Sequence, residues 1–391
     1  MSPDNELAKR GQTVLILGGG IGGIGSAMRL RSLLPKEHRV ILVERDTTFV
    51  FAPSLLWMLT GNRSREHISR PYANLEKHGI ELVRGEIQKI DLERREAVVD
   101  GKTLTGDYLV VALGAELAPE TIPGLAQAGH NFYSLAGTES ARDALASFTG
   151  GRIVVLTAAP AYKCPAAPYE ATMLIESYMR KRKIRDKCTI DMYAAEPNPL
   201  PVAGPRVGTW IRKIYGRKGL GYHTEHQVTE VDPASRTLKF KNGVEAKFDL
   251  LIYVPPHRAP RVLRESGLLG ENGWLAVDRN TMKTPYERVF ALGDVVSIPL
   301  ALGKPLPKAG VFANLEATAV AKTISHSITG KGKPMMVKGD GSCFIEIGDG
   351  RAGFSRGNFY AEPLPKVKMY PPMWGWHAGK VLIEKLWLRN F

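Results

Sequence analysis

A glycine-rich turn near the start of the chain constrains its fold most strongly. In VLILGGGIGGIGSA, Gly18, Gly20 and Gly23 have GxGxxG spacing, follow a predicted strand and open a predicted helix. Glycines permit the tight turn and let a pyrophosphate approach the helix N-terminus, where free N–H groups attract anions. Glu44 ends the next predicted strand, RVILVE, where its carboxylate can accept hydrogen bonds from ribose hydroxyls. The segment is therefore predicted to bind a dinucleotide.

Two later segments indicate which dinucleotide is bound. TPYERVFALGDVV, with Gly293 and Asp294, resembles the second FAD signature of flavoproteins that contain two dinucleotide-binding domains. DYLVVALGA, with Gly114, resembles the connecting strand of the same superfamily. The resemblance implies FAD rather than NAD, with Asp294 directed at the ribityl chain and phosphate.

Strand-like and helix-like segments alternate along most of the chain, which is typical of parallel α/β sheets with crossover helices. We expect two Rossmann-like domains, the second inserted in the first, and a C-terminal membrane-docking module. The predicted boundaries are residues 11–118 and 277–331 for the FAD domain, 119–276 for the inserted domain and 332–391 for the C-terminal module.

The inserted domain lacks the feature that would hold a pyridine nucleotide. Its first predicted strand, RIVVL, leads into TAAPAYKCPAAPYE, and there is no glycine between Leu156 and Gly204. A second pyrophosphate would have no loop in which to settle. Electrons are therefore expected to come from a donor other than NAD(P)H.

These motifs together resemble the sulfide:quinone oxidoreductases and the related flavoprotein subunit of flavocytochrome c sulfide dehydrogenase. The resemblance covers nearly the whole chain and includes FVFAPSLLWMLTG, KCPAAPYE, GSCFIEI and an aromatic, basic C-terminus. KCPAAPYE is the most specific of these because it combines a cysteine, a proline-stiffened turn and a glutamate.

The resemblance implies that Cys164 and Cys343 form a redox-active disulfide or polysulfide bridge, with Cys343 on the flavin side. Hydrosulfide would attack a disulfide sulfur and leave a persulfide and a thiolate. Glu170 would accept a proton near the sulfurs, with a pKa raised by burial. The alternative is that the two cysteines are buried thiols or a structural disulfide. Cys188 is expected to be a core thiol.

The chain departs from the family in its cysteines. Some members carry a third functional cysteine before the inserted domain, whereas residues 1–163 contain none. Sulfur chain growth would then depend on two cysteines. The positions used elsewhere for covalent attachment of FAD also lack cysteine, so FAD is expected to bind noncovalently. No paired metal-ligand spacing is present, and we expect no metal.

Lys308 precedes the predicted helix GVFANLEATAVAKTISHSI. The resemblance implies that the start of this helix points at the pyrimidine end of the flavin, where Lys308 would add positive charge to the helix dipole. The alternative is an exposed lysine at a helix start.

The chain ends in a predicted amphipathic helix. One stripe carries Leu382, Ile383, Leu386 and Trp387, whereas Lys380, Glu384, Lys385 and Arg389 mark the other side. Residues 366–391 carry five basic side chains and one acidic, a balance suited to an anionic membrane surface. A helix that packs on its own domain or on a dimer partner is the alternative. The candidate quinone and membrane residues are Phe354, Phe359, Tyr360 and Trp387.

Charge and hydropathy limit the kinds of partner that the chain can have. The formal net charge of +14 favours an anionic partner, but no nucleic-acid module accompanies the basic runs. No signal peptide and no membrane-spanning segment are expected. The leading hypothesis is a monotopic, membrane-associated enzyme that takes hydrosulfide and quinone, and a homo-oligomer is compatible with it. The alternatives are electron transfer to cytochrome c, an NADH:quinone oxidoreductase, or a flavin-stabilised interaction protein without turnover.

Overall fold

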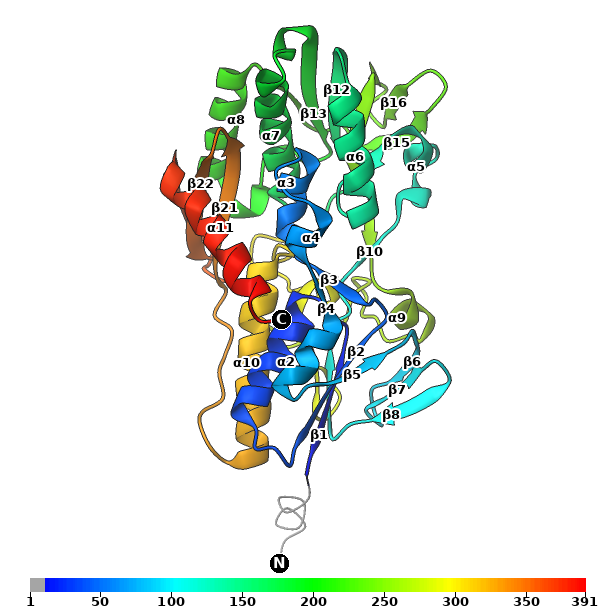
Figure 1. Ribbon diagram of the computed structural model, residues 1–391, viewed down its shortest axis with the longest axis vertical. Helices are drawn as coiled ribbons and strands as arrows, with labels where there is room; N and C mark the ends of the chain where they lie inside the picture. The colour runs from blue at the N-terminus through cyan, green and yellow to red at the C-terminus, as the bar shows by residue number, and fades with distance from the viewer. Residues whose placement is uncertain (1–10) are drawn as a thin grey trace, which may run out of the picture.

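The computed structural model describes residues 11–391. The expectation about a signal peptide concerns the first ten residues and therefore lies outside the described residues. Figure 1 shows two α/β domains stacked along the long axis, with a smaller C-terminal module against one side.

The first domain is built on a five-stranded parallel sheet in the order β20-β9-β1-β2-β5. Its strands are β1 (Thr13–Leu17), β2 (Arg39–Glu44), β5 (Glu81–Arg84), β9 (Tyr108–Val111) and β20 (Val289–Ala291). Most residues of β1, β2 and β9 are buried apolar side chains, as expected for a parallel sheet covered on both faces. Helices α2 (Ile21–Leu33) and α10 (Gly310–Thr329) lie side by side against it.

The second domain also contains a five-stranded parallel sheet, in the order β11-β18-β12-β13-β14. Its strands are β11 (His130–Asn131), β12 (Gly151–Thr157), β13 (Cys188–Ala194), β14 (Gly221–His223) and β18 (Leu250–Val254). Helices α6 (Leu135–Ser147), α7 (Ala167–Lys181) and α8 (Pro205–Lys218) share one apolar core with this sheet. The opposite face packs on a small sheet of β15 (Val228–Asp232), β16 (Thr237–Phe240) and β17 (Glu245–Lys247).

The C-terminal module consists of an antiparallel sheet and one helix. The sheet contains β21 (Asp340–Gly348), β22 (Arg351–Asn358) and β23 (Lys366–Met373), and the helix is α11 (Trp374–Leu388). Strand β21 packs against α7, and α11 crosses β22. The module therefore sits beside the second domain, although a long segment after α10 of the first domain leads into it.

One segment of the first domain packs against the second domain. After β2 the chain forms β3 (Thr48–Val50) and α3 (Leu55–Leu59), and α3 packs against α6 and α7. The remaining helices are α4 (Arg65–Ile68), α5 (Leu125–Ala128) and α9 (Arg261–Glu265), and the remaining strands are β4 (Ser69–Pro71), β6 (Ile87–Asp91), β7 (Glu96–Val99), β8 (Lys102–Thr105), β10 (Glu116–Leu117) and β19 (His257–Arg258). The predicted fold class is confirmed, whereas the residue boundaries of the domains and the membrane role of the module stay predictions.

Candidate functional site

A long cleft of about 1130 Å³ runs along the carboxyl ends of the first sheet to the junction of the domains. It is lined by eight of the predicted residues: Gly18, Gly20, Glu44, Gly114, Cys164, Gly293, Asp294 and Lys308. Gly23 lies behind the turn, where a Cβ atom would sit 1.8 Å from the Gly18 carbonyl oxygen. A ligand site at the carboxyl ends of the strands is the usual arrangement in parallel α/β sheets.

The glycine turn and the end of β2 form one end of this cleft. Oε2 of Glu44 accepts a hydrogen bond of 2.7 Å from the Gly19 amide, so the carboxylate is fixed beside the turn. Tyr72, which the sequence reasoning missed, donates from its hydroxyl to the Gly19 carbonyl at 2.7 Å. Gly18 has φ of 101°, a conformation that favours glycine.

This end of the cleft fits a dinucleotide. The N-cap residue of α2 is Gly20, which has no side chain to cap the helix. The space beside it is open, because a Cβ atom built there would meet nothing within 4 Å. The N-terminal amides of α2 are thus accessible to a phosphate. A cleft of this size is ample for a large cofactor, since ligand pockets commonly span about 300 to 1,000 Å³. Gly18, Gly20, Glu44 and Asp294 are the residues that would hold FAD.

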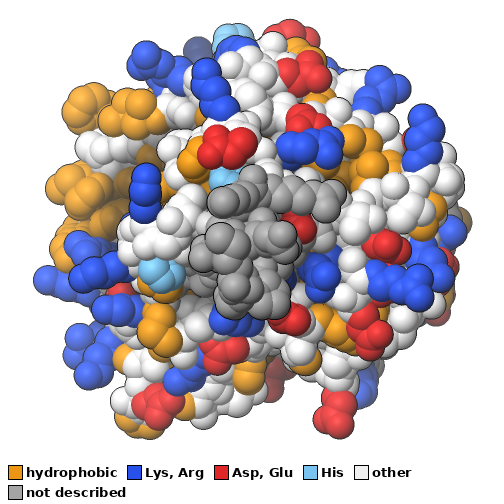
Figure 2. Space-filling model, turned by 90° about the horizontal axis from the view of Figure 1, so that it is seen from below, with side chains coloured by type: hydrophobic (Ala, Val, Ile, Leu, Met, Phe, Trp, Pro, Cys, Tyr) orange, Lys and Arg blue, Asp and Glu red, His pale blue; other side chains and the backbone are white. Residues whose placement is uncertain are grey.

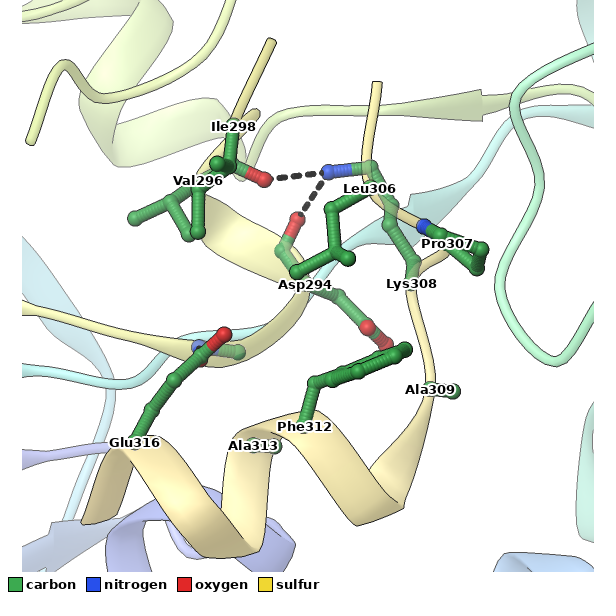
Figure 3. A pocket seen from close by; sticks show the side chains of 11 residues that line it. Asp294, Val296, Ile298, Leu306, Pro307, Lys308, Ala309, Phe312, Ala313 and Glu316 are labelled. Atoms are coloured by element: carbon green, nitrogen blue, oxygen red, sulfur yellow. Dashed lines mark hydrogen bonds between the residues drawn. The ribbon is translucent and has the colours of Figure 1, made fainter. Parts of the chain in front are cut away.

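Lys308 lies in a buried polar cluster at the start of α10, shown in Figure 3. Its Nζ donates to the carbonyl oxygens of Asp294 and Val296, each at 2.7 Å, and lies 3.5 Å from the centre of the Trp274 ring. The side chain is 8% exposed, so the alternative of an exposed lysine is wrong. Burial lowers the pKa of Lys308 to about 8, against the opposing charge of Asp294.

Glu316 is a second buried acid in the same cluster, and sequence reasoning missed it. Its Oε2 accepts a hydrogen bond of 2.7 Å from the Gly293 amide. Burial, assisted by the charge of Asp294, raises the pKa of Glu316 to about 7. The sequence signal was available: Glu316 is the only acid within residues 310–329, the helix that follows the FAD signature.

Cys164 lies in the loop between β12 and α7, on the wall of the cleft. Its amide donates to the Lys308 carbonyl at 2.6 Å, and its carbonyl accepts from the Tyr133 hydroxyl at 3.1 Å. Burial raises the pKa of Cys164 to about 12, as does the charge of Glu170, whereas a hydrogen bond from the Ala167 amide at the start of α7 lowers it. The loop thus ties this cysteine to the buried polar cluster around Lys308.

Cys343 lies on β21 of the C-terminal module, the strand that packs against α7. Burial raises its pKa, and the charges of Glu170 and of Cys164 add to this effect. All three cysteines of the chain are free thiols in the structure. The two predicted cysteines therefore interact electrostatically, but their joining in a disulfide stays a prediction. Cys188 is 6% exposed in the core, with its Sγ directed at the Ile184 carbonyl at 3.2 Å.

Glu170, in the first turn of α7, is 2% exposed. Its Oε1 lies 2.6 Å from Nζ of Lys380 and accepts a hydrogen bond of 2.8 Å from the Glu346 amide. Burial raises the pKa of Glu170, against the charge of Lys380. The raised pKa of Glu170 expected from the sequence agrees with this direction. Burial alone would lower the pKa of Lys380, but the charges of Glu170 and Glu346 outweigh it and raise that pKa.

The orientation of α11 corrects one expectation. The predicted polar side does not face solvent as a whole, because Lys380 and Glu384 point inward. Both oxygens of Glu384 bind Arg63, at 2.9 to 3.1 Å, and Oε1 accepts a hydrogen bond of 2.6 Å from Ser54. Lys380 is bound to Glu170 and is therefore not available to an anionic membrane surface.

The outward face of α11 carries a group of apolar side chains beside the exposed Lys385 and Arg389. Leu382 is 55%, Ile383 48% and Leu386 51% exposed. Trp374, at the start of the helix, is 73% exposed. Figure 2 shows hydrophobic side chains gathered at the left edge of the molecule, the side on which α11 lies in Figure 1, with Lys and Arg side chains beside them. Among residues 11–391, no helix is long and apolar enough to cross a membrane.

The four candidate quinone and membrane residues lie in different packing environments. Phe354 stacks on Trp376 of α11, with 4.6 Å between ring centres. Phe359 packs edge-on against Phe312 of α10, and Tyr360 donates to the Arg279 carbonyl, so both lie against the first domain. Trp387 lies partly buried against the rings of Phe49 and Phe51. A quinone role for these residues stays a prediction.

The place where a second phosphate loop would lie is filled by the chain itself. Tyr162, in the loop after β12, is 4% exposed. Burial raises its pKa, and its hydroxyl interacts with the carboxylate of Glu196, which follows β13. Glu196 also accepts from the Thr157 hydroxyl at 3.2 Å. This acid occupies the position in the second sheet that Glu44 occupies in the first, yet its partners are protein side chains.

The fold and cleft define a dinucleotide-dependent oxidoreductase. The family of pyridine nucleotide-disulphide oxidoreductases matches residues 12–317, and the chain belongs to it. It is a flavin-dependent oxidoreductase with FAD as its cofactor.

Two relatives and one solved structure give the finer comparison. The chain is 26% identical to a sulfide-quinone reductase of Aquifex aeolicus, over 96% of this chain and 90% of that protein. It is 27% identical to the mitochondrial sulfide:quinone oxidoreductase of Mus musculus, over 91% of this chain and 80% of that one. The crystal structure of the Aquifex aeolicus sulfide:quinone oxidoreductase superposes with a TM-score of 0.87 at 24% identity, covering 97% of this chain and 91% of that one.

Proposed function

We propose that this protein oxidises sulfide and passes the electrons through FAD to a quinone. The observation that carries the proposal is that Cys164 lines the cleft, and that Cys343 and the buried Glu170, from distant parts of the chain, interact electrostatically with it. The charges of Cys164 and Glu170 both act on Cys343. The printed functions of the relatives support the same chemistry.

The reaction balances with one proton from solvent. Hydrosulfide loses two electrons and one proton as it becomes zero-valent sulfur, and a quinone gains two electrons and two protons. In the first step, the sulfur of hydrosulfide attacks a disulfide between Cys164 and Cys343, the S–S bond breaks, and a persulfide and a thiolate result. FAD, when bound, accepts the electron pair and passes it on.

The residues of the chain set the protonation states for this step. A thiolate is costly at either cysteine, because burial raises both pKa values. A neutral disulfide and a pair of protonated thiols both avoid this charge, whereas the attack of hydrosulfide on the disulfide creates a thiolate in the site. Glu170 is the acceptor for the proton of the persulfide, since its own pKa is raised by burial.

The exposed apolar side chains of α11 support the proposal that the protein attaches to a membrane. Leu382, Ile383 and Leu386 expose their side chains to solvent. A group of exposed apolar side chains marks a surface that interacts with a membrane or with another molecule. An interfacial helix places such a face in the acyl boundary, with aromatic and basic residues near the headgroups. A quinone dissolved in the bilayer would then reach the flavin from this side.

The test is anaerobic addition of sulfide, and separately of NADH, to the oxidised holoprotein. Flavin absorbance should bleach with sulfide, stay unchanged with NADH, and recover when a short-chain quinone is added. Bleaching by NADH alone would instead indicate an NADH:quinone oxidoreductase. Recovery with oxidised cytochrome c but not with quinone would indicate a sulfide dehydrogenase.

A further inference from the structure

Beyond the Glu170–Lys380 pair, a second buried acid leads to the protein surface. Glu346, on β21, is 1% exposed, and both its carboxylate oxygens lie 3.0 Å from Nδ1 of His377. His377 lies on α11, and its side chain is 28% exposed. An acid buried this deeply needs a partner. A lysine or arginine with a permanent charge would serve equally well if the partner of Glu346 were only structural. A histidine can instead take up and release protons near neutral pH.

The two buried acids are connected. The Glu346 amide donates to Oε1 of Glu170 at 2.8 Å, so the residues are held side by side. Lys380 binds Glu170 directly at 2.6 Å, and its charge also acts on Glu346. Three groups, all from different elements of the chain, thus follow one another: Glu170 of α7, Lys380 of α11 and Glu346 of β21.

Trp57 of α3 covers one side of the row formed by Glu170, Lys380, Glu346 and His377, which we call the seam. Its ring packs edge-on against His377, with 5.8 Å between ring centres, and lies 5.4 Å from Nζ of Lys380. Apolar cover of this kind excludes bulk water. A proton at Glu170 therefore has no direct exchange with solvent along this wall, and the exposed edge of His377 is where the seam reaches the surface.

We infer that Glu346 and His377 form a proton relay that connects the buried Glu170–Lys380 pair with the surface beside α11. This inference rests on the proposed function. The persulfide S–H proton passes to the Glu170 carboxylate and from there to the neighbouring Glu346, with Lys380 as the fixed cation that acts on both carboxylates. Glu346 then passes a proton to Nδ1 of His377 while Nε2 releases one. No electrons move in these steps, and proton number is conserved.

The relay answers a requirement of the reaction. Each turnover takes up one net proton from solvent, and the quinone consumes two, whereas the sulfur site releases one. His377 lies on the helix whose outer face carries Leu382, Ile383 and Leu386, the side from which a membrane quinone would arrive. The seam thus carries protons from the sulfur site to the place where they are needed.

The test uses the holoprotein with His377→Asn and Glu346→Gln, and with His326→Asn as the matched control, because His326 lies on α10 away from this seam. Steady-state quinone reduction by sulfide is measured from pH 6 to 9 in H₂O and D₂O, together with FAD content and vesicle binding. We expect kcat to fall by about tenfold or more in both relay variants, with a changed pH profile. FAD content and vesicle binding should be unchanged.

Chemical rescue separates a relay from a structural contact. In His377→Ala, added imidazole should restore at least about a third of the lost kcat, because it supplies a diffusible proton carrier. Loss of activity without rescue and with an unchanged pH profile would mean a structural role and would overturn the relay. So would full activity in His377→Asn. If sulfide fails to bleach the flavin of the unsubstituted protein, it is the proposed function that fails.

Discussion

Nζ of Lys380 lies 2.6 Å from Oε1 of Glu170, although 210 positions separate the two residues. The pair joins α11 to the first turn of α7, beside both candidate redox cysteines. Because burial makes an isolated charge costly, each residue stabilises the charged form of the other. The C-terminal helix is thereby coupled to the sulfur site, and the same helix presents its apolar face outward.

The first prediction concerns this ion pair. Lys380→Met leaves the Glu170 carboxylate buried without its partner, and should lower the free energy of unfolding by about 3 to 5 kcal/mol. Adding Glu170→Gln should recover much of that loss, since the unpaired charge is then removed. Urea unfolding of both single variants and the double variant gives the coupling energy. Additive effects would contradict the interaction.

The second prediction concerns the cysteines. Cys164→Ser and Cys343→Ser should retain FAD, because neither thiol is among the groups that would hold the cofactor. Both variants should lose flavin bleaching by sulfide. Cys188→Ser is the matched control, since this thiol lies in the core of the second domain. It should keep sulfide bleaching while losing some stability. Full sulfide turnover in either of the first two variants would refute the role of the pair.

The sequence predicted which local motifs line this cleft. Strand, glycine turn and helix are adjacent in the chain, so Gly18, Gly20 and Glu44 could be assigned from spacing alone, and Asp294 from a short signature. The contacts of Lys380, Glu346 and His377 could not be predicted in this way, because they depend on how β21 and α11 pack on α7. Helical periodicity correctly separated Leu382 and Ile383 from Lys380, but it did not show that Lys380 and Glu384 of the charged side face inward.

The third prediction concerns attachment to membranes. Replacing Leu382, Ile383 and Leu386 together by Ser should abolish sedimentation with anionic vesicles, because burial of one such side chain contributes roughly 1.5 to 3 kcal/mol. Activity with a water-soluble short-chain quinone should remain, since these side chains point away from the sulfur site. Val244→Ser, an exposed apolar residue of the second domain at 43% exposure, is the control. Unchanged sedimentation of the triple variant would exclude α11 as the docking surface.

The last prediction concerns Glu316 and the pH dependence of stability. Its folded pKa of about 7 lies above the ordinary 4.5, so the folded state binds more protons than the unfolded state between these values. The stabilising contribution is therefore present below pH 4.5 and is lost as the pH rises through 7. Glu316→Gln keeps an oxygen for the Gly293 amide but does not ionise. With FAD in excess, its stability relative to the unsubstituted protein should rise between pH 5 and 8 by an amount on the order of 3 kcal/mol. Urea unfolding at the two pH values measures this difference, and an equal effect at both would show that Glu316 is already ionised in the folded protein at pH 5.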